Sequence, residues 1–173
     1  MKRLTITLTV LLACVCSMFA KDDKVNYELM KNVSTINYSF DYSAFKISKI
    51  KAKDFVDMKL NMDYDKFTGV IENILIENAN ENMSSSKLIL SNEQPSDVEI
   101  KGMPISADDD GENTIMFKLV YKPTDTLITS FKLNTNGGDN DRFQEEFMKS
   151  LSKTGKKLGK QLSTIKAKSN STK

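Results

Sequence analysis

Hydrophobic and polar residues alternate in the first structured stretch of the chain. Between positions 36 and 42 every even-numbered residue is aromatic or β-branched, and every odd-numbered residue is polar. This period of two predicts a strand with one buried face. We expect Tyr38, Phe40 and Tyr42 on the core face, with a carbohydrate-stacking platform as the alternative.

The spacing of apolar residues changes to three and four after Asp63. The apolar positions are Phe67, Val70, Ile71, Ile74, Leu75 and Ala79. Such spacing predicts an amphipathic helix. Asp63 or Asp65 is the expected N-cap, and the asparagine-rich residues 78–82 are expected at its end.

Four short strand-like segments follow, at residues 87–90, 98–101, 114–121 and 127–133. They are separated by turn residues, which include Pro95, the acidic run 108–112 and Pro123. Short connections predict an antiparallel meander, because a parallel crossover needs a dozen or more residues. The acidic run around Gly111 is expected to be a hairpin turn, because the alternating ligand spacing of a calcium loop is absent.

A second amphipathic helix is predicted from Asp139 or Asp141, since Asp141 and Gln144 have capping-box spacing. The residues expected to be buried on it are Phe143, Phe147, Leu151, Leu158 and Leu162. Gly155 and Gly159 flank this stripe, where missing side chains would let the helix approach a sheet. The elements together predict an α+β two-layer sandwich, with a mainly antiparallel sheet of about five strands and two helices on one face. The domain is expected to cover residues 26–165, followed by a disordered tail at 166–173.

The first twenty residues have a different pattern. Lys2 and Arg3 precede an apolar run at 4–15, and polar residues begin at Lys21. This profile predicts a secretory signal peptide, residues 1–20, whose apolar run is shorter than the roughly 20 residues of a membrane span. The protein is therefore expected to be periplasmic, outer-membrane-associated or secreted.

Two processing routes are open for this segment. Cleavage after Ala20 gives a secreted chain. Residues 11–14, Leu-Leu-Ala-Cys, resemble a lipobox, in which Cys14 is lipidated and associates the protein with the outer membrane.

The composition narrows the chemistry. The chain has no histidine, and its two cysteines, Cys14 and Cys16, both lie in the signal segment. This argues against His-dependent catalysis, thiol nucleophiles and zinc sites built on Cys or His. We expect no catalytic, metal or cofactor-binding residue. Carboxylates alone are left, so a small carboxylate-dependent hydrolase is the alternative.

Charge is distributed unevenly. From position 149 onward the chain has eight lysines and no acidic residue. Five of these lysines share the polar face of the second predicted helix: Lys149, Lys153, Lys156, Lys157 and Lys160. This face is a candidate contact for an anionic surface, with a solvated helix face as the ordinary interpretation. Nucleic acid is not an expected partner, because the chain is exported and the lysines lack interleaved arginine or aromatic residues.

Three short motifs resemble those of uncharacterised exported proteins of Bacteroidetes. They are Phe-Asp-Tyr-Ser at 40–43, Phe-Lys-Ile at 45–47 and Lys-Asp-Phe at 53–55. More distantly, the order of elements is similar to small α/β envelope lipoprotein domains, such as those of the lipopolysaccharide-assembly lipoprotein and the N-terminal part of TolB. The resemblance implies an envelope protein and assigns no catalytic residue. The expected function is a non-enzymatic envelope or surface protein that binds another protein or a glycan.

Overall fold

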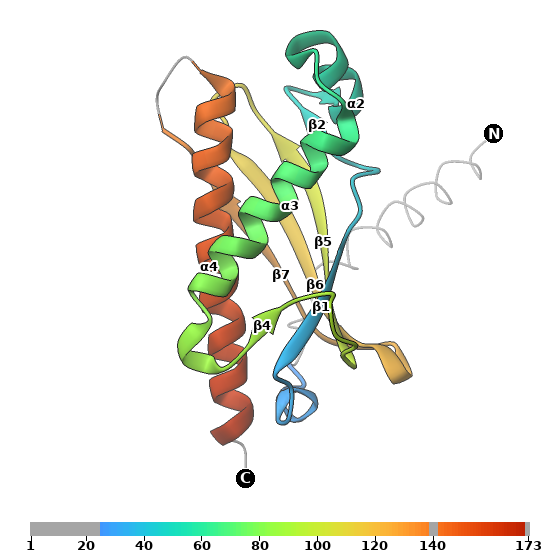
Figure 1. Ribbon diagram of the computed structural model, residues 1–173, viewed down its shortest axis with the longest axis vertical. Helices are drawn as coiled ribbons and strands as arrows, with labels where there is room; N and C mark the ends of the chain where they lie inside the picture. The colour runs from blue at the N-terminus through green and yellow to red at the C-terminus, as the bar shows by residue number, and fades with distance from the viewer. Residues whose placement is uncertain (1–24, 139–141, 172–173) are drawn as a thin grey trace, which may run out of the picture.

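The fold is an α+β arrangement of one mixed sheet and two long helices (Figure 1). The computed structural model describes residues 25–138 and 142–171. The strands are β1 (Thr35–Phe40), β2 (Lys46–Ile47), β3 (Ile50–Lys51), β4 (Ile89–Leu90), β5 (Val98–Ala107), β6 (Asn113–Tyr121) and β7 (Thr126–Thr135). The long helices, α3 (Tyr64–Glu81) and α4 (Phe143–Ser171), lie on the same face of the sheet.

Within the described residues the sheet has seven strands and is partly parallel. The long strands β5, β6 and β7 form the predicted antiparallel meander. In contrast, β1 pairs in parallel with both β4 and β5, and β2 also pairs in parallel with β5. The prediction of about five, mainly antiparallel strands was therefore wrong where β1, β2 and β4 join the sheet. Helix α3 lies between β1 and β4 in the chain, and it forms the crossover that a parallel pair requires.

The core lies between the sheet and the helices. Alternate residues of the central strands are buried there, including Ile100, Phe117 and Leu119. The β1 aromatic residues lie on this same side, half-buried, as expected from their period of two. Phe40 packs directly on Gly102 of β5, where an added Cβ would lie 2.4 Å from the ring. The core interpretation of this strand accounts for its aromatic residues.

Helix α3 begins where the sequence indicates. Asp63 is its N-cap, and its Oδ1 accepts a hydrogen bond from the backbone N–H of Lys66 at 3.0 Å. Two short helical segments precede it, α2 (Ala52–Phe55) and the π-helical η3 (Val56–Leu60). Asn61, in the left-handed region with φ 47°, ends η3 and turns the chain into α3.

Helix α4 buries the predicted apolar stripe. Phe147, Leu151, Leu158 and Leu162 are all buried, and Phe143 is half-buried. The proposed caps Asp139 and Asp141 lie outside the described residues.

The predicted disordered tail was wrong for residues 166–171, because α4 continues to Ser171. Its last turns pack against the short 3-10 helix η2 (Tyr27–Met30). Lys166 Nζ donates to the carbonyl oxygens of Met30 at 2.9 Å and Lys31 at 2.8 Å. Burial lowers the pKa of Lys166. These two hydrogen bonds attach the last turns of α4 to the end of η2.

The two glycines of α4 face α3 rather than the sheet. A Cβ on Gly155 would lie 2.6 Å from the carbonyl oxygen of Leu75, and one on Gly159 would lie 2.3 Å from that of Ala79. The expectation that these glycines approach the sheet was wrong. The side of α4 that faces the sheet carries the larger residues of the buried stripe, and the glycines lie on the adjacent side. Their spacing of four keeps both on the side of α4 that contacts α3.

Candidate functional site

An apolar groove lies between α3 and α4 at their N-terminal ends. It has a volume of about 150 Å³. Its lining residues are Leu60, Met62, Phe67, Val70, Ile71, Phe143, Gln144, Phe147, Met148 and Leu151. Among these, Gln144 is the one polar side chain. We call this feature the helix groove.

The close contact at the two glycines explains where the groove opens. Both helices run in the same general direction, and they approach most closely at Gly155 and Gly159. Toward their N-termini the helices diverge, as Figure 1 shows for the upper ends of α3 and α4. The groove lies in the space between the diverging ends.

Aromatic rings form the floor of the helix groove. The ring of Phe147 stacks on Phe67 and on Phe143, with centroid distances of 6.0 and 5.3 Å. Phe55 of α2 contacts Phe143 edge-on at 5.2 Å. Such ring pairs are rigid and contribute about 0.5–1.5 kcal/mol each beyond simple burial, so the floor is preformed.

Exposed apolar side chains form the rim. Met62, Val70 and Met148 are 39%, 36% and 48% exposed. Met58, in the same short helix as Leu60, is 62% exposed. Methionine is common on surfaces that adapt to different apolar partners. A rim of this kind around a rigid floor is typical of a binding surface rather than of a solvated helix face.

The lysines singled out from the sequence have different environments. Lys149 Nζ forms an ion pair with Glu146 at 2.7 Å, and this carboxylate raises the pKa of Lys149. Lys153 donates to the carbonyl oxygens of residues 136 and 137, and Lys157 donates to that of residue 134. These two lysines therefore cover the open edge of β7. Lys156 and Lys160 are exposed, with no ion pair in the part of the chain described.

A buried polar cluster joins α4 to the ends of β6 and β7. Asn113 Nδ2 donates to Ser150 Oγ at 2.6 Å, and Thr154 Oγ1 donates to Asn113 Oδ1 at 3.1 Å. Thr135 bonds to Thr154 and to the Ser150 carbonyl. All four side chains are buried and hydrogen-bonded to one another, so their polar groups act as structural links. Nothing in the sequence periodicity indicated this cluster.

Glu146 is buried beside two glycine-containing loops. A Cβ on Gly137 would lie 2.1 Å from the Glu146 carbonyl oxygen, and one on Gly111 would lie 2.5 Å from the backbone nitrogen of Phe147. Gly111, with φ 75°, also closes the predicted acidic hairpin turn, in which Asp108 Oδ1 accepts from the Glu112 N–H at 2.7 Å.

Within residues 25–138 and 142–171, no group of three or more His, Cys, Asp or Glu residues is arranged to hold a metal ion.

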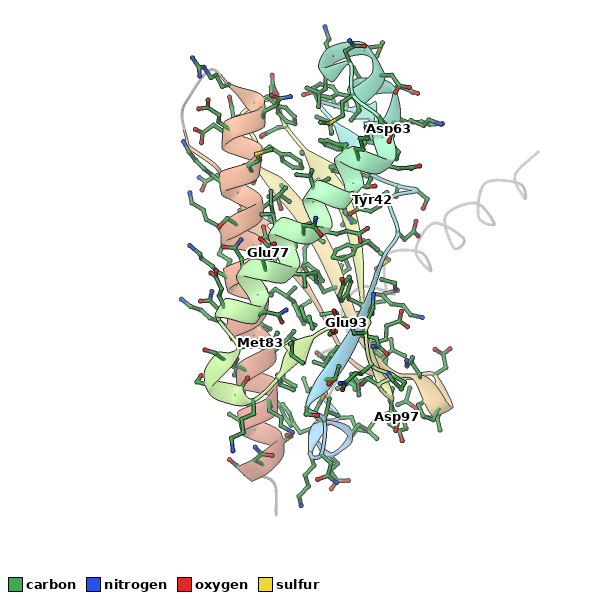
Figure 2. The ribbon with its side chains drawn as sticks, in the orientation of Figure 1. Tyr42, Asp63, Glu77, Met83, Glu93 and Asp97 are labelled. Atoms are coloured by element: carbon green, nitrogen blue, oxygen red, sulfur yellow. The ribbon has the colours of Figure 1, made fainter. Side chains whose placement is uncertain are left out.

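Tyr42 and Glu72 of α3 are two neighbouring titratable groups with raised pKa values. The Tyr42 hydroxyl donates to the Thr68 carbonyl at 3.3 Å, and Figure 2 shows Tyr42 beneath the upper part of α3. Burial, together with the nearby Glu72, raises the pKa of Tyr42. Burial also raises the pKa of Glu72, although the Tyr42 hydroxyl near its carboxyl opposes this. Neither residue lines the helix groove.

Sequence reasoning missed the helix groove. The helical period places Val70 on the apolar stripe of α3, and the sequence pattern does not single out Met62 or Met148. One signal was present. Val70 and Ile74 lie at the edge of the apolar stripe of α3, so the stripe spans more of the helix circumference than contact with the sheet alone needs.

Comparison with known proteins gives structural neighbours of low similarity. No protein-family model and no curated protein matches this chain. The crystal structure of XCC0632 from Xanthomonas campestris, a DUF330 protein, aligns with 13% identity and a TM-score of 0.43 over 58% of this chain. The chain spans 65% of that protein. A second crystal structure, of an uncharacterised protein, aligns with 14% identity and a TM-score of 0.45 over 76% of this chain and 92% of its own.

Proposed function

We propose that this protein is a non-enzymatic binding protein of the bacterial envelope or cell surface, and that it holds another protein chain in the helix groove. The observation that carries the proposal is the groove itself, a rigid aromatic floor with an exposed methionine and valine rim. Two helices with an apolar groove between them are a common receptor for apolar side chains of a partner.

The groove lining favours protein over glycan as the ligand. Sugars are held by several polar side chains in addition to an aromatic face, whereas Gln144 alone offers hydrogen bonds among the lining residues. A carboxylate hydrolase needs two convergent acids in a cleft, and the lining contains none. The lining therefore supports the binding of apolar side chains, which is what a protein partner supplies.

The envelope location rests on the first twenty residues, whose charged, apolar and then polar profile is that of a signal peptide. Among the helices of the described residues, none is both long and apolar enough to cross a bilayer. If Cys14 is the processed N-terminus, a lipid holds the domain at the outer membrane.

In-cell cross-linking of groove variants tests this proposal. Val70→Glu places a charge on the rim and should abolish cross-linked partners that the parent protein yields in its own host. Thr164→Glu, at an exposed position of α4 outside the groove, is the matched control and should keep them. Identical cross-linked partners for both variants would overturn the proposal.

A further inference from the structure

The two helices that border the groove have opposite charge. Helix α3 carries four acidic residues and one lysine, and α4 carries seven lysines and two acidic residues. On the side of α3 away from the sheet, residues 66, 70, 73, 77 and 81 follow one another at spacings of three and four. All five are exposed. We call them the α3 ridge; Figure 2 labels Glu77 on it.

Helix α4 has an equivalent row on the same outer side. Its exposed members are Glu145, Met148, Lys149, Lys156 and Lys160, which we call the α4 ridge. The glycine contacts give the relative height of the two ridges, because Gly155 lies beside Leu75 and Gly159 beside Ala79. Because Gly155 also meets Asn78 and Gly159 also meets Asn82, residues of α3 lie at the height of α4 residues numbered about 77 to 80 higher.

Side chains at the same height on the α3 ridge and the α4 ridge are complementary. Glu77 lies level with Lys156, and Glu81 lies level with Lys160. Val70 lies level with the Met148–Lys149 turn. None of the three ion pairs in the described residues involves Glu77, Glu81, Lys156 or Lys160. These charges are free to pair with another molecule.

We infer that the partner held by the helix groove is a second copy of this chain, packed helix layer against helix layer about a two-fold axis parallel to the helices. This inference rests on the proposed function and names its partner. Such an axis preserves height and exchanges sides, so the α3 ridge of one copy meets the α4 ridge of the other. Each copy then contributes its own Met148 and Val70 to close the other's groove.

Charge selects this axis over its alternative. A two-fold axis perpendicular to the helices within the same layer would place α3 against α3 and α4 against α4. This axis reverses height, so about the middle of the layer Glu81 would face Lys66, but Glu77 would face Val70 and Lys156 would face Lys149. Like charges placed against each other in an interface are unfavourable. The parallel axis pairs both glutamates of each α3 ridge with lysines and sets no like charges against each other, so charge favours it.

The helix layer is large enough for a stable contact. Helix α3 has 18 residues, a length of about 27 Å, and two adjacent helices are about 20 Å wide. The layer therefore offers on the order of 500–600 Å² in projection, before the relief of the side chains is counted. A standard interface buries about 800 Å² per partner, so a contact over the whole layer approaches that class.

Charge reversal tests the inference. The gene is expressed with its own signal segment, and the exported product is studied by sedimentation equilibrium. One variant is Glu77→Lys with Glu81→Lys, and the other is Lys156→Glu with Lys160→Glu. The control, Lys118→Glu with Lys132→Glu, makes the charge change of the second variant at exposed positions of β6 and β7. Thermal unfolding of every variant monitors the fold. The neutral pair Glu77→Gln and Lys156→Gln replaces any reversal variant that fails to fold, and each is expected to weaken the dimer less strongly.

We expect the parent and the control to be dimeric at tens of micromolar, and each reversed variant to dimerise at least tenfold more weakly. An equimolar mixture of the two reversed variants should recover the dimer, because each reversed ridge then meets its complement. A monomeric parent, dimers indifferent to charge reversal, or no recovery on mixing would overturn the inference. A monomeric parent whose partners are still lost with Val70→Glu would leave the proposed function standing with a different protein as partner.

Discussion

Gly159 of α4 lies against the backbone of Ala79 of α3, so closely that a Cβ at Gly159 would be 2.3 Å from the Ala79 carbonyl oxygen. This contact draws the C-terminal part of α3 against the middle of α4, and the N-terminal ends of the two helices diverge. The helix groove exists because the closest approach lies away from the N-terminal ends of the helices. The contact therefore links a glycine spacing in the sequence to the candidate binding site.

Gly159→Ala should destabilise the domain by about 1–3 kcal/mol, because the backbone carbonyl that the new methyl group meets cannot easily move. This loss should exceed the gain of up to about 1 kcal/mol from better helix propensity. Gly69→Ala, on α3, is the control, since nothing lies within 4 Å of its added Cβ. It should stabilise the protein by up to about 1 kcal/mol. Urea unfolding of both variants measures the difference, and equal effects would contradict the close packing.

The buried polar cluster that joins α4 to the ends of β6 and β7 should behave as one unit. Asn113→Ala removes the partner of both Ser150 and Thr154, at a cost of about 1–3 kcal/mol. Thr154→Val should cost less once Asn113 is already replaced. A double-mutant cycle in urea is expected to give a coupling energy of about 0.5–3 kcal/mol. Additive effects would show that the two side chains act independently.

The lysines of α4 should separate into two groups. Lys153→Gln with Lys157→Gln removes the hydrogen bonds to the β7 edge and should lower stability by about 0.5 kcal/mol per residue. Lys156→Gln with Lys160→Gln should leave the melting temperature unchanged when it is measured at a concentration at which the protein is monomeric. If α4 binds an anionic surface, binding to anionic vesicles at low salt should fall with the second pair. Loss of stability with the second pair instead of the first would contradict these contacts.

These groups show what the sequence could and could not predict. The N-cap at Asp63 and the buried stripe of α4 follow from local patterns, and the structure confirms both. The partners of Lys153, Gly155 and Lys166 depend on which distant segment lies beside α4. Helical periodicity identifies a face of a helix but not its neighbour, so the glycine contact was assigned to the wrong element and the last turns of α4 were missed.

Glu72 gives a pH dependence of defined sign. Burial raises the pKa of its carboxyl above 4.5, the ordinary value. A raised pKa in the folded state means that the stability from this group is full below the unfolded pKa and is lost as pH rises through the folded value. Glu72→Gln is neutral at every pH, so its melting temperature relative to the parent should increase between about pH 4 and about pH 7. Thermal unfolding across this range tests it, and a constant or falling difference would contradict the assignment.

Site-specific photo-cross-linking at position 148 tests the central claim, that the helix groove holds a protein chain, most directly. A photoreactive phenylalanine derivative replaces Met148 on the rim or, as the matched control, Thr164 on the same helix outside the groove. After irradiation in the native host, the account predicts a protein adduct at 148 and none at 164. The self-association described above further predicts that the adduct maps to the α3 ridge near Val70 of a second copy. No adduct at 148, or equal adducts at both positions, would contradict the claim.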